Sequence, residues 1–191
     1  PSKLGLKRGQ TIRVKDTILA LITKSANDAA VVIAEALGGT EIKFAQMMTK
    51  KARQIGMRRT RFRNASGLPN RRQVSTARDM ALLSRILINQ FPNYYNYFAI
   101  RKFHFRGNSF KNHNKLLGHY EGADGIKTGY TSAAGYNLSA SAERDGTRLI
   151  AVVFGGKTAK FRDNHVKKLL NKCFAKTAVS RIADILLTSS K

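Results

Sequence analysis

Two β-rich runs joined by a two-residue turn place the strongest constraint on how this chain folds. Residues 136–144 and 147–154 are separated only by Asp145-Gly146. This dipeptide favours a type I′ turn, whose twist matches that of two paired antiparallel strands. The pattern predicts a β-hairpin, with the apolar residues 149–153 at the centre of a sheet. Any fold for this chain must therefore contain an antiparallel sheet.

Helical periodicity dominates residues 16–98, whereas residues 100–175 change to short strands followed by one helix. The predicted helices cover residues 17–23 with Asp16 as N-cap, 27–37 with Asn27 as N-cap, 40–55 after Thr40, 76–89 after Thr76, and 158–175 after Thr158. The predicted strands before the hairpin are 102–105, 109–111 and 124–131. This order predicts an α+β fold, in which a helical part lies beside an antiparallel sheet flanked by helices.

Composition limits the possible partners. The 191 residues include 35 Lys and Arg against 11 Asp and Glu, a net charge of +24, and 42% of them are hydrophobic, which is too many for a disordered polycation. Basic residues cluster at 58–63, 71–72 and 167–176, but no nucleic-acid-binding motif accompanies them. We expect a basic surface that favours an anionic partner and no nucleic acid, and a nucleic-acid-binding module remains an alternative that rests on charge alone.

Cysteine and histidine usage argues against metal sites and internal disulfides. Cys173 is the single cysteine, and the four histidines have no paired spacing. We therefore expect no metal and no cofactor. No run approaches the ~18–20 apolar residues of a membrane span.

Two short motifs carry candidate chemistry. Ser25-Ala26-Asn27 lies at a break between two apolar helices, where buried polar side chains need partners. Lys127-Thr128-Gly129 lies on the glycine-rich strand candidate 124–131. Taken alone, the first motif could cap helices and the second could be an ordinary edge strand.

Together with their flanks, these motifs resemble a known family. The similar runs are Ser2–Leu6, Thr23–Ala30, Asn64–Leu68, Asp124–Thr131 and Gly135–Leu138. They resemble the serine D-alanyl-D-alanine carboxypeptidases of peptidase family S11, the low-molecular-weight penicillin-binding proteins, whose fold is shared with class A β-lactamases and marked by S-x-x-K, S-x-N and K-T-G. The resemblance covers residues 1–175, and we expect residues 176–191 to be a tail or linker.

The chain departs from the family pattern at one decisive point, because no serine is followed three residues later by lysine. The favoured explanation is that the N-terminal segment with the nucleophile is missing, since the chain starts at Pro1 without Met. The alternative is a pseudoenzyme that binds cell-wall peptide without cleaving it.

The resemblance implies acyl transfer on peptidoglycan stem peptides that end in D-Ala-D-Ala. The missing Ser would attack the carbonyl between the two D-Ala residues, helped by the missing Lys. Ser25 would relay a proton toward the leaving amine, Asn27 would hold the substrate backbone, and Lys127 would stabilise the developing anion. The polar break and the Lys127 strand should then face each other across a shared crevice.

The resemblance assigns four more residues to substrate binding. Thr128 would bind the substrate carboxylate, Gly129 would allow close approach of the substrate, and the N–H of Tyr130 would serve the oxyanion hole. Arg162 would help to fix the carboxylate, although it could also be a surface charge. We expect His113 to be a hydrogen-bonded structural residue rather than a ligand-binding one, and Tyr94, Tyr95 and Tyr97 to serve packing.

The resemblance also implies inhibitors and a compartment. β-Lactams should bind, and their loss should be slow, because Asp79 is the only acidic residue between Glu41 and Glu121 and a helix start explains it. The family works in the periplasm, where some members are attached to the inner membrane, so we expect the same location here.

Overall fold

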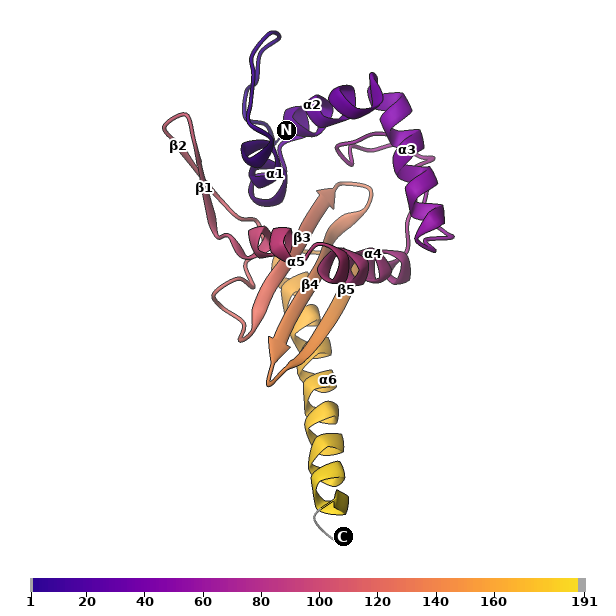
Figure 1. Ribbon diagram of the computed structural model, residues 1–191, viewed down its shortest axis with the longest axis vertical. Helices are drawn as coiled ribbons and strands as arrows, with labels where there is room; N and C mark the ends of the chain where they lie inside the picture. Colours follow the sequence, from indigo (N-terminus) through magenta and orange to yellow (C-terminus); the bar gives the residue numbers. More distant parts are fainter. Residues whose placement is uncertain (1, 189–191) are drawn as a thin grey trace.

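The computed structural model describes the backbone of residues 2–188 and the side chains of residues 2–179 (Figure 1). The first part of the chain contains α1 (Val14–Thr23), α2 (Asn27–Gly38), α3 (Glu41–Gln54), α4 (Ala77–Gln90), α5 (Pro92–Tyr95) and the 3-10 helix η1 (Asn96–Ala99). The second part contains β1 (Lys102–Phe105), β2 (Asn108–Lys111), β3 (Ala123–Thr131), β4 (Gly135–Arg144), β5 (Thr147–Gly156) and α6 (Ala159–Thr188). The α+β class predicted from the sequence is confirmed.

Helix starts follow the expected capping chemistry at three of the predicted positions. The side chains of Thr40, Thr76 and Thr158 each accept a hydrogen bond from a first-turn backbone N–H. Asp16 was expected to cap its helix, and this is wrong. The helix α1 begins at Val14, and Asp16 lies in its first turn, where its carboxylate binds the guanidinium of Arg13 at 2.7 Å.

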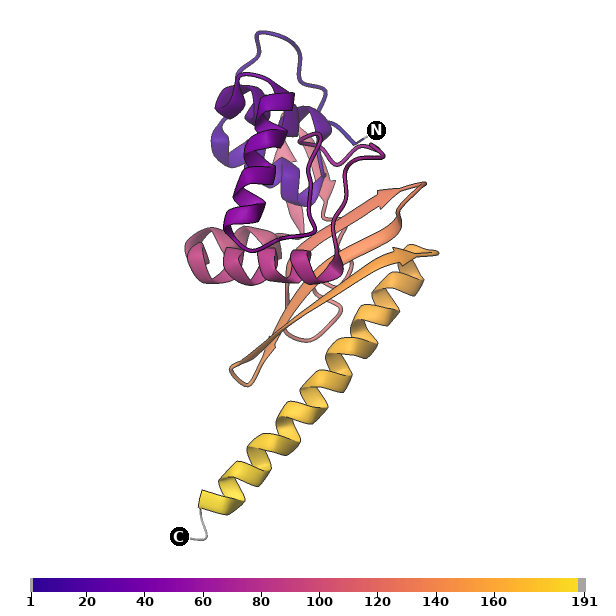
Figure 2. The same ribbon diagram turned by 90° about the vertical axis from the view of Figure 1, so that its right-hand side faces the viewer.

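The hairpin predicted around Asp145-Gly146 is present. Arg144 pairs with Thr147, and both turn residues have positive φ, 47° and 70°, as a type I′ turn requires. In the described residues the strand order is β3-β4-β5, so the expectation that residues 149–153 lie at the centre of the sheet is wrong. The strand β5 is apolar because α4 packs on one of its faces and α6 on the other (Figure 2).

The main core lies between the sheet and α6. Leu138 and Ala140 on β4 pack there against Val166 and Leu170 of α6, and all four are buried. Of the apolar stripe predicted for this helix, Phe161 and Leu169 are exceptions, since both are exposed. The predicted tail 176–191 continues α6 as helical backbone to residue 188, residues 189–191 lie outside the described residues, and a separate tail stays a prediction.

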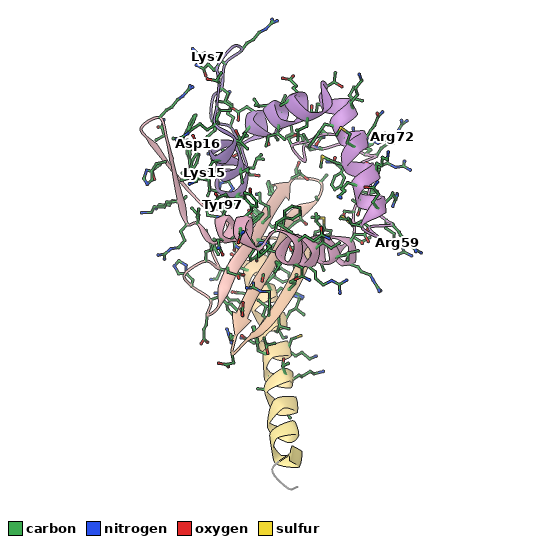
Figure 3. The ribbon with its side chains drawn as sticks, viewed as in Figure 1. Lys7, Lys15, Asp16, Arg59, Arg72 and Tyr97 are labelled. Atoms are coloured by element: carbon green, nitrogen blue, oxygen red, sulfur yellow. The ribbon has the colours of Figure 1, made fainter. Side chains whose placement is uncertain are left out.

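A second core joins the helical part to the hairpin β1–β2. Buried Phe103 on β1 packs with residues of α1 and of the break that follows it. Tyr95 is buried and stacks on Phe98, and the ammonium of Lys15 lies over the ring of Tyr97 (Figure 3). These contacts agree with the packing role expected for Tyr95 and Tyr97, whereas Tyr94, for which the same role was expected, is exposed. Among the described residues, no helix combines the length and apolar character needed to cross a membrane.

Candidate active site

The break between α1 and α2 holds Ser25 in an unusual backbone conformation. Its φ is 56°, in the left-handed region, between the C-cap of α1 at Lys24 and the N-cap of α2 at Ala26. Such a conformation costs a non-glycine residue roughly 1–2 kcal/mol. Neither Ser25 nor Asn27 caps a helix with its side chain, so the helix-cap alternative is wrong. Asn27 was predicted as N-cap, but it is the first residue inside α2.

Asp28 braces this break against the start of the chain. Its carboxylate accepts the backbone N–H groups of Leu4, Gly5 and Leu6 at 2.8–3.1 Å, and that of Ala29 at 3.0 Å. Burial alone would raise the pKa of Asp28, but the four backbone hydrogen bonds outweigh it and lower the pKa. The sequence favoured Asp28 only as a first-turn acid that suits the helix dipole.

Ser2 completes the brace. Its hydroxyl donates to the carbonyl of Lys24, and its own carbonyl accepts the N–H of Asn27 at 2.8 Å. Lys24 and Asn27, which stand on either side of Ser25-Ala26, are therefore held by a residue that lies outside both helices. This explains how a polar, strained break is held between two apolar helices.

Lys127 lies on β3, which is an edge strand in the described residues. Its ammonium donates to the carbonyl of Thr128 at 2.8 Å. Burial lowers the pKa of Lys127 to about 8, and the positive charge of Arg162 contributes in the same direction. A lysine in this environment carries its charge at neutral pH but holds it weakly.

Arg162 is buried at the start of α6, with 4% of its surface exposed, so the surface-charge alternative is wrong. Its Nε and Nη2 donate to Asp163 Oδ1 at 2.9 and 2.7 Å, and its Nη1 donates to the carbonyl of Asn137 at 3.3 Å. Gly156 permits this approach, because a Cβ there would lie 2.9 Å from the Cβ of Arg162. Three of the five guanidinium N–H groups are used, which leaves two for a ligand.

One cleft of about 940 Å³ collects the candidate residues from three separate parts of the fold. The α1–α2 break, β3 and the start of α6 all contribute to its walls. Every residue assigned to the site from the sequence lines it, namely Ser25, Asn27, Lys127, Thr128, Gly129, Tyr130 and Arg162. The structure thus brings the two motifs together, and the role of each residue stays a prediction.

The cleft also contains residues without a predicted role, namely the segment 66–70 and Tyr136. The segment 66–70 forms one wall, and a local side-chain hydrogen bond shapes it, in which Asn64 Oδ1 accepts the N–H of Gly67 at 2.8 Å. The rings of Tyr130 and Tyr136 lie 4.3 Å apart at their centroids, and Tyr130 is 58% exposed. The family-like runs 64–68 and 135–138 were the sequence signal for these residues. That resemblance assigned them no role, so it did not predict that they line the cleft.

His113 also lines the cleft, and the expectation of a hydrogen-bonded structural histidine is wrong. No hydrogen bond of its ring joins it to the part of the chain that the structure describes. Burial and the positive charges of Lys127, Lys24 and Arg162 lower the pKa of His113. Three cationic side chains therefore act on the region around His113.

No acidic residue lines the cleft within the described part of the chain. Asp79, the one acid between Glu41 and Glu121, is buried elsewhere and accepts hydrogen bonds from Arg59 N at 2.9 Å and Thr60 Oγ1 at 2.6 Å. The structural role expected for Asp79 is confirmed. The cleft suits an anionic ligand, and its described lining residues offer no carboxylate to activate water.

Comparison with known proteins identifies the family of this chain. The D-alanyl-D-alanine carboxypeptidase family, peptidase S11, matches residues 1–158. The chain belongs to this family. This chain is 38% identical over 185 residues to the D-alanyl-D-alanine carboxypeptidase DacF of Bacillus subtilis, and the match covers 91% of this chain and 46% of that relative. It is 40% identical over 170 residues to DacA of Escherichia coli, covering 88% of the chain and 42% of that relative.

Solved structures confirm that this chain has the fold of penicillin-binding proteins. Penicillin-binding protein 5 from Haemophilus influenzae matches with a TM-score of 0.88 and 39% identity, over 92% of this chain and 52% of that one. Penicillin-binding protein D2 from Listeria monocytogenes, in its ampicillin-bound form, matches with a TM-score of 0.82 and 35% identity, over 90% of this chain and 72% of that one. This chain spans less than half the length of DacF and of DacA.

Proposed function

We propose that this chain forms the substrate-binding and proton-relay part of a serine D-alanyl-D-alanine carboxypeptidase, which removes the terminal D-Ala from peptidoglycan stem peptides. The observation that carries the proposal is the convergence of the S-x-N break, the K-T-G strand and a buried arginine on one acid-free cleft. Family membership supports the same reaction class.

The nucleophile in this proposal is a Ser-x-x-Lys pair that the 191 residues do not contain. Its serine oxygen attacks the carbonyl between the two D-Ala residues, and its lysine takes the hydroxyl proton. The C–N bond then breaks, Ser25 passes a proton to the leaving amine, and an acyl-enzyme and free D-Ala result. Water releases the shortened peptide.

The remaining residues hold the substrate and stabilise charge. Asn27 binds the substrate backbone, and the N–H of Tyr130 contributes to the oxyanion hole. The terminal carboxylate binds the Thr128 hydroxyl and the two unused N–H groups of Arg162. Lys127 supplies a positive charge beside both steps, and its depressed pKa lets it share a proton near neutral pH.

Gly129 gives independent support for a ligand along β3. A Cβ at this position would meet nothing closer than Asn137 Cβ at 4.0 Å, and its φ is not positive. The packing of the chain itself therefore does not require glycine here. Close approach of a substrate backbone to the strand does explain it.

The proposal includes β-lactams as slowly released inhibitors and the periplasm, free or attached to the inner membrane, as location. Penicillin would acylate the same serine, and its loss would be slow, because the described residues that line the cleft include no carboxylate to activate the deacylating water. The strongly positive chain, at +24, would also be attracted to an anionic wall polymer.

Fluorescent penicillin provides the test. The full natural gene product that includes these residues should be covalently labelled, and Lys127→Ala should abolish labelling while Lys43→Ala, an exposed change on α3, should not. Labelling of the Lys127→Ala variant at the normal rate would contradict the role of Lys127. A gene product that binds D-Ala-D-Ala peptide but is never labelled would instead establish the pseudoenzyme.

A further inference from the structure

A second cleft of about 1140 Å³ lies beside the candidate active site. Its walls come from the hairpin β1–β2, the segment 111–119 and the first turns of α6. Six of its lining residues carry a positive charge, namely Arg101, Lys102, Lys111, Lys115, Lys160 and Lys167. We call this second cleft the basic groove.

The basic groove has no internal counter-charge. Asp163 is its one acidic lining residue, and that carboxylate already accepts two hydrogen bonds from Arg162. Among the described side chains, none of the six basic residues forms an ion pair. The positive charge of the basic groove is therefore open to a ligand.

The arrangement of two of these lysines is unfavourable without a ligand. Lys102 on β1 and Lys111 on β2 are directly paired across the two strands. Like charges at such a position destabilise a strand pair. An anion bound between the two ammonium groups would turn this repulsion into attraction.

The basic groove continues into the candidate active site. His113, Lys115 and Ala159 line both clefts. The lowered pKa of His113, which burial and nearby cations cause, agrees with a positive field at the junction. A polymer whose end enters the active site can thus place its neighbouring anionic groups in the basic groove.

We propose that the basic groove binds carboxylate groups of the peptidoglycan polymer that lie outside the D-Ala-D-Ala terminus, so that it selects polymeric over monomeric substrate. The proposal rests on the proposed function, because it takes its ligand from the polymer that carries the cleaved peptide. Nucleic acid fits less well, since no Phe or Tyr among the described lining residues offers a base a stacking surface.

Sedimentation of the full chain with purified sacculi, stripped of phosphate-containing polymers, tests the proposal. The double variant Lys102→Glu/Lys111→Glu should bind at least about tenfold more weakly than the unchanged chain, because two attractive contacts become repulsive. The matched control, Lys43→Glu/Lys50→Glu on exposed positions of α3, makes the same change in net charge and should bind nearly as well as the unchanged chain. Thermal unfolding of both variants verifies that each one folds.

The ligand is tested with sacculi whose carboxylates have been converted to methyl amides. Binding of the unchanged chain to amidated sacculi should fall to the level of the variant Lys102→Glu/Lys111→Glu. Binding of that variant should decrease little further on amidation. Equal binding by both double variants, undiminished binding to amidated sacculi, or tighter binding to a DNA oligonucleotide at the same salt would each overturn the proposal.

Penicillin labelling separates failure of this inference from failure of the proposed function. Groove variants of the gene product should be labelled at the normal rate, because none of the residues proposed to act on penicillin lines the basic groove. Normal labelling with unchanged sacculus binding rejects the groove alone. Absent labelling in every form of the protein rejects the carboxypeptidase, and any groove-dependent binding would then belong to a pseudoenzyme.

Discussion

Replacing Lys127 with Met should make the protein more stable at neutral pH. Burial and Arg162 lower the pKa of Lys127 from 10.5 to about 8. At about 1.4 kcal/mol per pH unit, keeping this lysine charged costs the folded state about 3 kcal/mol. Methionine has a similar length and no charge, so it avoids this cost, although it loses the hydrogen bond to Thr128.

The pH dependence isolates the charge from changes in packing. Below pH 8, Lys127 is protonated in both states and the cost is fully present. Between pH 8 and 10.5 the unfolded chain binds more protons than the folded one, so the stability of the unchanged protein rises with pH. About 2.5 kcal/mol of this rise should fall between pH 7 and 10, which corresponds to roughly 5–10 °C in Tm.

The assay is denaturant unfolding of the unchanged protein, Lys127→Met and Lys43→Met across this pH range. The stability advantage of Lys127→Met should shrink as the pH rises, and all other titrating groups cancel in the difference. Lys43→Met, at an exposed position of α3, should change stability by less than about 0.5 kcal/mol. A difference between Lys127→Met and the unchanged protein that stays constant from pH 7 to 10 would refute the reasoning.

Three further changes test the bracing and the ligand side of the cleft. Ser25→Gly should be about 1 kcal/mol more stable than Ser25→Ala in chemical unfolding, because only glycine adopts φ 56° without strain; equal stabilities would contradict the strain. Asp28→Ala should lower the free energy of unfolding by about 2–4 kcal/mol, because it removes a carboxylate that accepts four N–H groups. In the unchanged protein the stabilisation by Asp28 should be lost as the pH falls below the ordinary pKa of 3.8, and the variant should not show this loss. Gly129→Ala should keep its Tm but slow penicillin labelling of the gene product at least tenfold, on the order of a lost close contact; normal labelling would remove the requirement for glycine.

Local signals were sufficient to predict much of the fold. Asp145-Gly146 fixed the hairpin because the turn geometry depends on two adjacent residues only. Thr40 and Thr76 marked helix starts for the same reason. The position of β5 at the edge of the described sheet was not predictable, because covering by α4 and α6 makes a strand as apolar as a central position does.

The sequence was sufficient to predict the two motifs of the candidate site, but not the contacts that hold them in place. Ser25 and Lys127 stand in short runs that mark the family, so sequence alone assigned them to one site. The hydrogen bonds from residues 4–6 to Asp28 join segments that are more than twenty residues apart. The position of His113 in the cleft depends on a wall that several elements form together. No periodicity or spacing encodes such contacts.

Two unfavourable features of the fold meet in the candidate cleft. Ser25 is strained in its backbone, and Lys127 is charged where burial opposes charge. They lie on separate elements, and either cost could be removed by one substitution without disturbing the other, since glycine suits the first position and an apolar residue the second. Sequences keep such conflicts where function requires them. Two independent conflicts that line one cleft therefore point to chemistry there more strongly than either motif does alone.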